Sequence, residues 1–287
     1  MRVVVLGGGG QVARAIIATA PSGHTVIARS RAELDISDPA AITAVLTEAR
    51  PDWIVNGAAY TSVDLAEEQV ANATQANDTA VGLLAAAADK AGCRLVHPST
   101  DFVFDGTSGR AYVPTDVTNP LSVYGRTKLA GERHARERGK SIVLRTSWVY
   151  ASSGRNFVLT MLRLMREKDK LSVVADQIGS PTWATGIARA IWGLIDANAP
   201  AGLYHWTDLG VASWYDFAVA IQEEALARGL LERSIPITPI ATADYPTKAV
   251  RPRFSVLDTR ATRALIPAVA QHWRENLRHM LDELRTA

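Results

Sequence analysis

Short apolar runs alternate with longer, alanine-rich stretches along the first half of the chain. The apolar runs predict strands at residues 3–6, 25–28, 53–56, 94–97 and 142–145. Most are apolar throughout rather than at alternate positions, which is typical of strands covered on both faces of a parallel sheet. The stretches between them predict helices at residues 11–19, 38–49, 65–91 and 121–137. This order favours an α/β fold with a doubly wound parallel sheet.

The alternation weakens after residue 150. A polar loop at 151–155 precedes an amphipathic helix near 157–167, prolines cluster later in the chain, and a helix near 273–284 closes it. We therefore predict a smaller α+β lobe built onto the sheet. The predicted division is a sheet domain at 1–150, with part of 183–200, and a second lobe at 151–182 and 201–287.

Charge and cysteine content exclude several classes of protein. The 287 residues carry 31 Lys plus Arg and 29 Asp plus Glu, a formal net charge of +2. Because no basic block exceeds two residues, we expect no nucleic-acid partner. The single cysteine, Cys93, excludes an internal disulfide framework and favours a reducing, cytoplasmic location. Without a signal sequence or an apolar span of about twenty residues, we expect no membrane association.

A glycine run joins the first predicted strand to the first predicted helix. Gly7, Gly10 and Ala13 fit the pattern G-x-x-G-x-x-A, and Gly8 gives the related G-x-G-x-x-A. Glycines let a pyrophosphate approach the backbone, and the helix N-terminus offers it free N–H groups. The position between strand and helix favours a Rossmann-like dinucleotide site over a plain flexible turn.

Two arginines, Arg29 and Arg31, follow the second predicted strand, where an NAD-specific site usually carries an acid. A guanidinium matches a phosphate group in bidentate fashion. The sequence therefore predicts NADPH as cofactor, with NADH as the alternative because both arginines can also be merely solvated.

Tyr124 and Lys128 share one face of the predicted helix at 121–137, since they are four residues apart. A tyrosine of pKa about 10 needs about 4 kcal/mol of phenolate stabilisation to exchange a proton near neutral pH. An ammonium about 4 Å away supplies about that much at an effective dielectric of about 20. The spacing alone is more typical of a surface pair, but the hydroxyl of Thr100 follows the fourth predicted strand at the same sheet edge. Together these residues predict a proton-transfer site.

Several segments together resemble the extended short-chain dehydrogenase/reductase family. They are residues 10–12, 51–56, 61–64, 99–104, 124–132, 145–150, 176–182 and 251–252, so the resemblance covers both predicted lobes. The resemblance implies that the substrate is a dTDP-4-keto-6-deoxyhexose. It further implies that NADPH reduces the C4 keto group of this substrate and that the product is dTDP-L-rhamnose.

The resemblance also implies catalytic roles and cofactor contacts. Tyr124 is expected to give a proton to the developing alkoxide, Lys128 to lower the tyrosine pKa and hold the nicotinamide ribose, and Thr100 to hydrogen-bond the carbonyl or the tyrosine. The expected cofactor contacts are Gly7, Gly10, Gln11, Val12, Arg29, Asp35, Ile36, Ala59, Tyr60, Thr61, Tyr124 and Lys128.

The expected substrate contacts are Thr100, Asp101, Trp148 and Arg251. Each of the last three has a structural alternative. Asp101 can instead cap a helix or turn, Trp148 can be a core aromatic residue, and Arg251 can pair with an acidic neighbour rather than with a nucleotide diphosphate.

The sequence departs from the family pattern in one respect and leaves two alternative functions open. Some members of the family are dimers bridged by magnesium with the help of an acid on the first helix, but residues 12–18 contain none. We therefore expect no metal, and a homodimer stays open. One alternative is an NADP-binding regulatory subunit resembling that of methionine adenosyltransferase. The other is a different NDP-4-keto-6-deoxysugar reductase or epimerase. The presence of Tyr124, Lys128 and Thr100 favours an enzyme.

Overall fold

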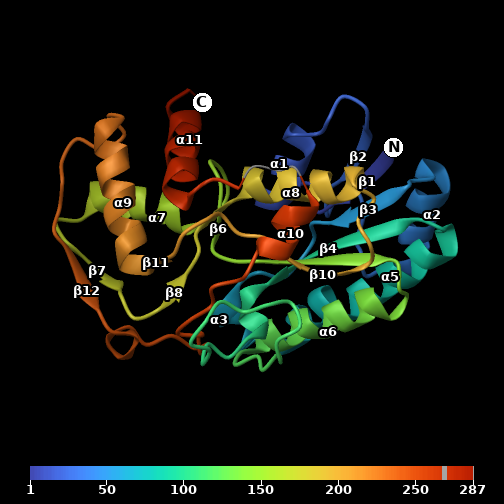
Figure 1. The fold of residues 1–287 in the computed structure, drawn as a ribbon, viewed down its shortest axis with the longest axis horizontal. Coiled ribbons are helices and arrows are strands. Elements are labelled where there is room, and N and C mark those ends of the chain that lie inside the picture. The colour runs from blue at the N-terminus through green and yellow to red at the C-terminus, as the bar shows by residue number, and fades with distance from the viewer. Residues whose placement is uncertain (267–269, 287) are drawn as a thin grey trace.

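The computed structural model describes residues 1–266 and 270–286. A parallel sheet forms the middle layer of its larger lobe (Figure 1). Its strand order over these residues is β10-β5-β4-β3-β1-β2. The strands are β1 (Arg2–Leu6), β2 (Thr25–Arg29), β3 (Trp53–Asn56), β4 (Arg94–Thr100), β5 (Ser141–Thr146) and β10 (Gly202–His205). The order reverses between β1 and β3, and ligands of such sheets bind at the carboxyl ends beside that point. The predicted doubly wound α/β fold is confirmed.

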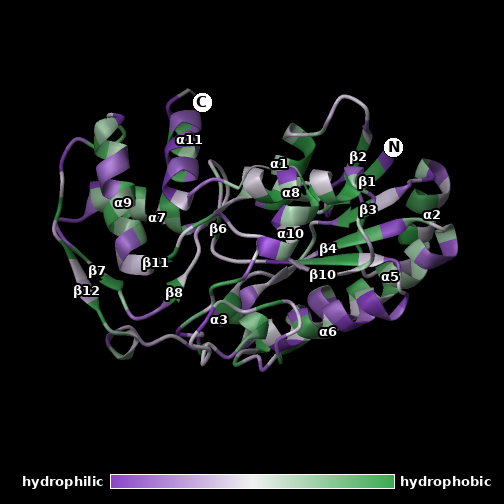
Figure 2. Ribbon diagram, viewed as in Figure 1, coloured by the Kyte–Doolittle hydropathy of each residue, from purple (hydrophilic) through white to green (hydrophobic). Residues whose placement is uncertain are grey.

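Helices cover both faces of the sheet (Figure 1). Helices α1 (Gln11–Ala18) and α8 (Ala184–Asp196) pack together on one face through Ile16, Ile187 and Ile191. On the other face lie α2 (Pro39–Ala49), α5 (Ala80–Ala91) and α6 (Val123–Glu137). Figure 2 shows hydrophobic strands between these layers and many hydrophilic residues on α6. The inner strands β1, β3 and β5 are buried on both faces, which explains their apolar runs, whereas the edge strands β2 and β10 are only partly buried.

The predicted helix at 65–91 is interrupted in the structure. It is divided into α3 (Val63–Ala66), α4 (Val70–Thr74), a π-helical turn η1 (Gln75–Thr79) and α5. The buried side chain of Asn77 lies in this turn, where its Oδ1 accepts from Tyr60 N at 2.8 Å and its Nδ2 donates to Tyr60 O at 2.9 Å. A bond between a side chain and a distant backbone leaves no trace in an apolar pattern, so the interruption could not be foreseen.

The smaller lobe packs three helices over two short sheets. The helices are α7 (Phe157–Glu167), α9 (Trp214–Ala227) and α11 (Trp273–Thr286). The sheets pair β7 (Leu171–Val174) with β12 (Ile237–Ile240), and β8 (Ile178–Gly179) with β11 (Ala212–Ser213). A further pair, β6 (Val149–Tyr150) and β9 (Thr182–Trp183), leads into the lobe, and the short elements η2 (Asp101–Val103), η3 (Thr242–Asp244) and α10 (Arg260–Leu265) complete the description.

The large sheet includes a strand from a part of the chain that the sequence assigned to the smaller lobe. Residues from 201 onward were predicted to belong to the smaller lobe, whereas β10 pairs with β5 as the edge strand of the large sheet. Ile266 likewise packs in the core formed by α1 and α8. Strand β10 has four residues, of which only His205 is fully buried. Such a short strand has no apolar run long enough to be recognised in the sequence.

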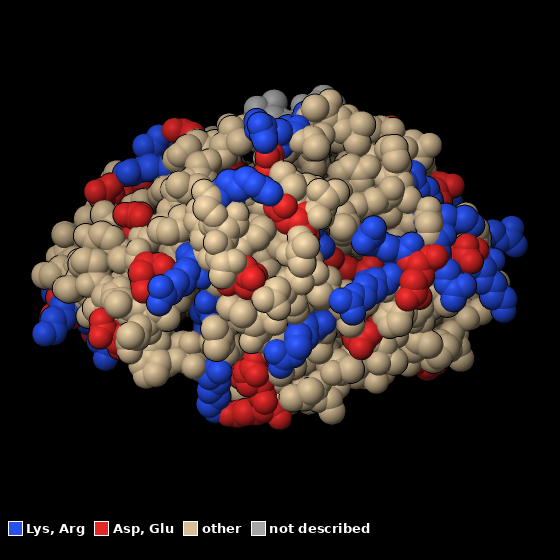
Figure 3. All heavy atoms as spheres, turned by 60° about the horizontal axis from the view of Figure 1, so that its bottom comes forward, with Lys and Arg blue, Asp and Glu red and all other residues tan. Residues whose placement is uncertain are grey.

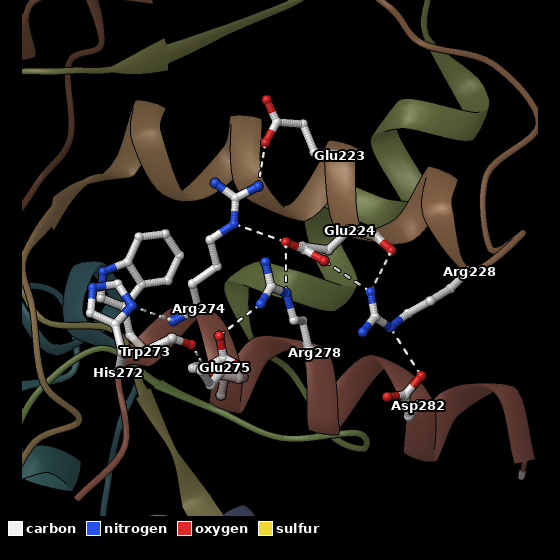
Figure 4. A network of polar contacts seen from close by, with 10 residues as sticks. Glu223, Glu224, Arg228, His272, Trp273, Arg274, Glu275, Arg278 and Asp282 are labelled. Carbon is white, nitrogen blue, oxygen red and sulfur yellow. Dashed lines mark hydrogen bonds and ion pairs between the residues drawn. The ribbon is translucent and has the colours of Figure 1, made fainter.

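A network of ion pairs around the buried carboxylate of Glu224 joins α9 to α11 (Figure 4). The carboxylate of Glu224 accepts hydrogen bonds from Arg274 Nε at 2.8 Å, Arg278 Nε at 3.0 Å and Arg228 Nη1 at 2.9 Å. Burial alone would raise the pKa of Glu224, but these three guanidinium groups outweigh it and lower the pKa. The network therefore keeps the carboxylate charged and stabilises the outer part of the lobe.

The surface carries both signs of charge. On the face shown in Figure 3, basic and acidic side chains lie intermixed rather than in separate blocks. Among the described residues, no helix is long and apolar enough to span a bilayer.

Candidate active site

A cleft of about 500 Å³ opens along the carboxyl ends of β1, β3, β4 and β5. The glycine loop at Gly9 and Gly10 lines the cleft together with the loop at 154–155, which is bonded to Gln11. Tyr124 and Lys128 of α6 and the indole of Trp148 line the rest. The cleft therefore lies where the strand order predicts a ligand site, between the sheet domain and the segment that leads into the smaller lobe.

The glycine loop has the shape of a phosphate cradle. Gly7 has φ +69°, and a Cβ atom there would lie 2.6 Å from Ala58 N, so a side chain cannot be accommodated. Gly10 N donates to Gly7 O at 2.8 Å, and Gly10 then caps α1. Gly10, Gln11 and Val12 line the cleft, while Gly7 supports them from below. These residues fit a dinucleotide, because free N–H groups of α1 face the open space.

The proposed catalytic groups come from two elements. Thr100 ends β4, and Tyr124 and Lys128 lie on α6; all three line the cleft. The helix is docked closely, since a Cβ atom on Gly125 would lie 2.3 Å from Phe102 O. Thr100 Oγ1 donates to Asp101 Oδ1 at 3.0 Å and accepts from Phe102 N at 3.2 Å, which fixes this hydroxyl in the cleft. The structure thus brings the predicted triad together.

The protonation of Tyr124 and Lys128 differs from the sequence-based expectation. Desolvation raises the pKa of Tyr124 to about 12, although the neighbouring hydroxyl of Thr100 opposes it. Burial lowers the pKa of Lys128 to about 8, and its Nζ donates to Pro98 O at 2.8 Å. The predicted lowering of the Tyr124 pKa by Lys128 is therefore not found in the protein by itself, because desolvation of the phenolate is the larger effect. Tyr124 carries a proton at neutral pH.

Asp101 follows Thr100 and is buried. Its Oδ1 accepts from Thr100 Oγ1 at 3.0 Å, whereas its Oδ2 is buried with no hydrogen-bond partner among the described residues. Burial raises the pKa of Asp101 to about 6. The side chain lines the cleft and does not cap the turn that follows, since Thr100 Oγ1 accepts from Phe102 N instead.

Trp148 forms the wall of the cleft on the side of the smaller lobe. It has φ +47°, an unusual value for a tryptophan, and its ring stacks on Trp214 with centroids 3.5 Å apart. A Cβ atom on Gly179 would lie 2.5 Å from Trp148 Cε2. Stacking and this close approach hold the indole in one position, so it can serve as a rigid platform for a ligand.

Several predicted contact residues lie outside the cleft lining. Arg251 forms a bidentate ion pair with Asp64, with Nη2–Oδ2 2.6 Å and Nη1–Oδ1 3.1 Å, and thereby lowers the Asp64 pKa. Of the two partners considered for Arg251, a nucleotide diphosphate or an acidic side chain, the structure shows the acidic side chain of Asp64. Arg29 ends β2, and Nη1 of its side chain donates to Ala28 O. Asp35, Ile36 and Tyr60 also lie outside the cleft lining, whereas Ala59 and Thr61 line it.

Sequence reasoning missed other residues of this site. Asn56, Ser147 and Arg155 line the cleft, and Trp214 supports Trp148 from behind. Asn56 ends β3 and Ser147 follows β5, so their place at strand ends was a usable signal. Arg155 and Trp214 become neighbours of the cleft only through tertiary folding. Among the described residues, no group of His, Cys, Asp and Glu is arranged to hold a metal ion.

A parallel sheet with a glycine cradle at its switch point, joined to a Tyr-x-x-x-Lys helix, defines a nucleotide-binding protein of the short-chain dehydrogenase/reductase class. Residues 1–286 match the model of the RmlD substrate binding domain. The chain belongs to this family, which confirms the resemblance inferred from the motifs.

Individual relatives agree over nearly the whole length. A dTDP-4-dehydrorhamnose reductase of Aggregatibacter actinomycetemcomitans is 40% identical over 287 residues, covering 97% of this chain and 98% of the relative. The crystal structure of a dTDP-4-dehydrorhamnose reductase from Clostridium acetobutylicum has a TM-score of 0.93 at 36% identity, covering 99% and 100% of the two chains. A Bacillus anthracis dTDP-4-dehydrorhamnose reductase in complex with NADP has a TM-score of 0.92 at 33% identity, covering 98% and 99%.

Proposed function

We propose that this protein is an NADPH-dependent reductase that converts the C4 keto group of dTDP-4-dehydro-L-rhamnose to the alcohol of dTDP-L-rhamnose. The three relatives described above carry this activity in their names, and one of them is in complex with NADP. The protein is accordingly an enzyme with NADPH as its cofactor and a dTDP-sugar as its substrate.

One observation in particular supports the proposal. Protonated Tyr124 lines one cleft with Thr100 and Lys128, and the same cleft is lined by Gly9 and Gly10 of the glycine cradle. Gly10 would hold the diphosphate of a dinucleotide, and the cleft leaves room for its nicotinamide toward Tyr124. The reacting carbonyl would then lie between the nicotinamide and the Tyr124 hydroxyl. When bound, NADPH supplies the hydride that reduces C4.

The residues of the chain supply the proton and the geometry. Tyr124 donates its phenolic proton to the oxygen that becomes the C4 hydroxyl. Thr100 donates a hydrogen bond to the same oxygen when its single hydroxyl proton turns away from Asp101 Oδ1, its acceptor at 3.0 Å in the structure. Lys128 places a positive charge beside the phenolate that forms, which stabilises it more than the neutral phenol. Asp101 and Trp148 bound the space left for the sugar.

The test supplies NADPH and dTDP-4-dehydro-L-rhamnose to the purified protein and follows loss of NADPH absorbance. NMR of the product distinguishes dTDP-L-rhamnose from its C4 epimer, which would mark a reductase of opposite stereochemistry. Binding of NADP without turnover, together with copurification of a methionine adenosyltransferase, would instead support the regulatory-subunit alternative. The cytoplasmic location and the homodimer stay predictions, and light scattering after gel filtration tests the latter.

A further inference from the structure

The cleft contains few positive charges for the anions it is proposed to bind. Among its described lining residues, the cationic side chains are Lys128 and Arg155. Lys128 is buried at the reaction centre and hydrogen-bonded to Pro98, and Arg251 is held by Asp64 outside the lining. A dinucleotide and a sugar nucleotide each bring a diphosphate. Arg155 is therefore the cation in the lining whose guanidinium is available to a phosphate group.

Arg155 is exposed, and within the described part of the chain its guanidinium has no hydrogen bond or ion pair. Arg163 on α7, by contrast, is also exposed but pairs with Glu167 at 2.7 Å. An unpaired guanidinium at the wall of a cleft can engage an anion without first breaking an ion pair, so its charge is fully usable in binding.

The backbone of Arg155 is fastened to the start of α1. Gln11, the first residue of that helix, donates from Nε2 to Arg155 O at 3.1 Å. Its Oε1 accepts from Asn156 Nδ2 at 2.9 Å. Gly154 has φ +82°, and a Cβ atom there would lie 3.0 Å from Gln11 Cγ. The loop thus packs directly against the helix end that carries the phosphate-binding N–H groups.

We infer that Arg155 binds the diphosphate of the nicotinamide dinucleotide, an inference that rests on the proposed function. The loop lies beside the start of α1, and Arg155 lines the same cleft as Gly10 and Gln11, so the guanidinium adds a positive charge next to the helix N-terminus that receives the diphosphate. Asn156 also caps α7, because its Oδ1 accepts from Leu159 N at 3.0 Å. Cofactor binding is therefore linked through Gln11 and Asn156 to the first helix of the smaller lobe.

The diphosphate of the sugar nucleotide has the same chemistry, but the groups expected at the sugar lie elsewhere in the cleft. Thr100 ends β4 and Asp101 follows it, whereas Arg155 is bonded to the residue that follows Gly10. This placement favours the cofactor, and separate binding measurements with NADPH and dTDP distinguish the two sources.

The test compares Arg155→Gln, Arg155→Lys and the control Arg163→Gln in the full-length protein. Calorimetric titration gives dissociation constants for NADPH and for dTDP at low and high salt. For Arg155→Gln we expect NADPH binding to weaken about tenfold, the loss typical of one charged hydrogen bond, with a smaller dependence on salt. Arg155→Lys should recover part of the loss, and Arg163→Gln should bind like the unaltered protein. The dissociation constant of dTDP should not change.

Three outcomes would overturn the inference. Unchanged NADPH binding in Arg155→Gln contradicts it directly, and a loss confined to dTDP assigns Arg155 to the sugar nucleotide instead. An equal loss in Arg163→Gln shows a general charge effect. If the unaltered protein does not bind NADPH at all, the proposed function itself is wrong. If it binds NADPH and Arg155→Gln binds equally well, only the role inferred for Arg155 is wrong.

Discussion

Lys128 Nζ donates a hydrogen bond to the carbonyl oxygen of Pro98, with the two atoms 2.8 Å apart. Pro98 lies in β4 two residues before Thr100, and Lys128 lies on α6 one turn after Tyr124. One bond thus joins the strand that carries the threonine to the helix that carries the tyrosine. Because the ammonium is buried, its position is fixed before a ligand arrives, and reorganisation during proton transfer is small.

Tyr124→Phe removes the proton donor and leaves the ring in place. We expect kcat to fall by about 10² to 10⁴, the usual contribution of a positioned general acid, while NADPH binding persists. Steady-state kinetics and a titration with NADPH measure the two effects. Tyr204→Phe is the matched control, since its hydroxyl donates to Pro200 O far along the sheet edge. Full activity in Tyr124→Phe would contradict the assigned role.

Arg29→Asp tests the preference for NADPH. An aspartate repels the 2′-phosphate of NADPH and accepts hydrogen bonds from the ribose of NADH, so the ratio of kcat/KM for the two cofactors should fall about tenfold or more. An acid already lies nearby, because Glu33 accepts from Ser30 N and Oγ, both at 2.7 Å. Equal use of the two cofactors by both proteins would show that Arg29 does not contact the phosphate.

Gly179→Ala displaces the indole of Trp148. The new methyl group would lie 2.5 Å from Trp148 Cε2, and the ring cannot retreat because Trp214 is stacked behind it. We expect KM for the sugar nucleotide to rise about ten- to a hundredfold through misplacement of the platform, without loss of NADPH affinity. The control is Gly109→Ala, where no atom lies within 4 Å of the added methyl group. Similar kinetics of both variants would exclude Trp148 from the substrate site.

Glu132→Gln tests a buried ion pair between α6 and β5. Both side chains are 2% exposed, and Arg145 donates to Glu132 from Nε at 2.9 Å and from Nη2 at 2.6 Å. Removal of the carboxylate leaves a buried charge uncompensated, so the free energy of unfolding should drop by about 3–5 kcal/mol. Urea unfolding measures it. Glu167→Gln, which breaks the exposed pair with Arg163, should cost about 0.5 kcal/mol or less.

Asp208→Asn tests the pH dependence of stability. Burial raises the pKa of Asp208 to about 7, although Trp183 N donates to its carboxylate at 3.0 Å. The folded protein therefore binds this proton more tightly than the unfolded chain, whose carboxyl has a pKa of about 4. Protonation of Asp208 therefore adds to the free energy of unfolding. This contribution is complete below about pH 4 and is lost as the pH rises through about 7.

Asparagine does not titrate, so the stability of Asp208→Asn relative to the unaltered protein should rise by about 4 kcal/mol across that range. Urea unfolding at several pH values measures the difference. A stability difference that stays constant with pH would show that Asp208 is not the group that titrates.

The sequence by itself determined the sheet domain and the chemistry at its edge. Strands such as 3–6 and 53–56 are buried on both faces, and their continuous apolar runs record that burial locally. Gly7, Gly10 and the Tyr124–Lys128 spacing are likewise local signals, because turn geometry and helix periodicity act within a few residues. The confirmed fold class and family follow from these short-range patterns.

Tertiary structure alone decided which long-range partners each residue meets. Arg251 pairs with Asp64, 187 positions earlier in the chain, and Gln11 holds the backbone of Arg155, 144 positions later. The π-helical turn at Asn77 and the pKa of Tyr124 depend in the same way on groups from distant segments or on burial between them. Such contacts arise from packing of whole elements, whereas the apolar pattern of one segment records only that it is buried, not what it is buried against.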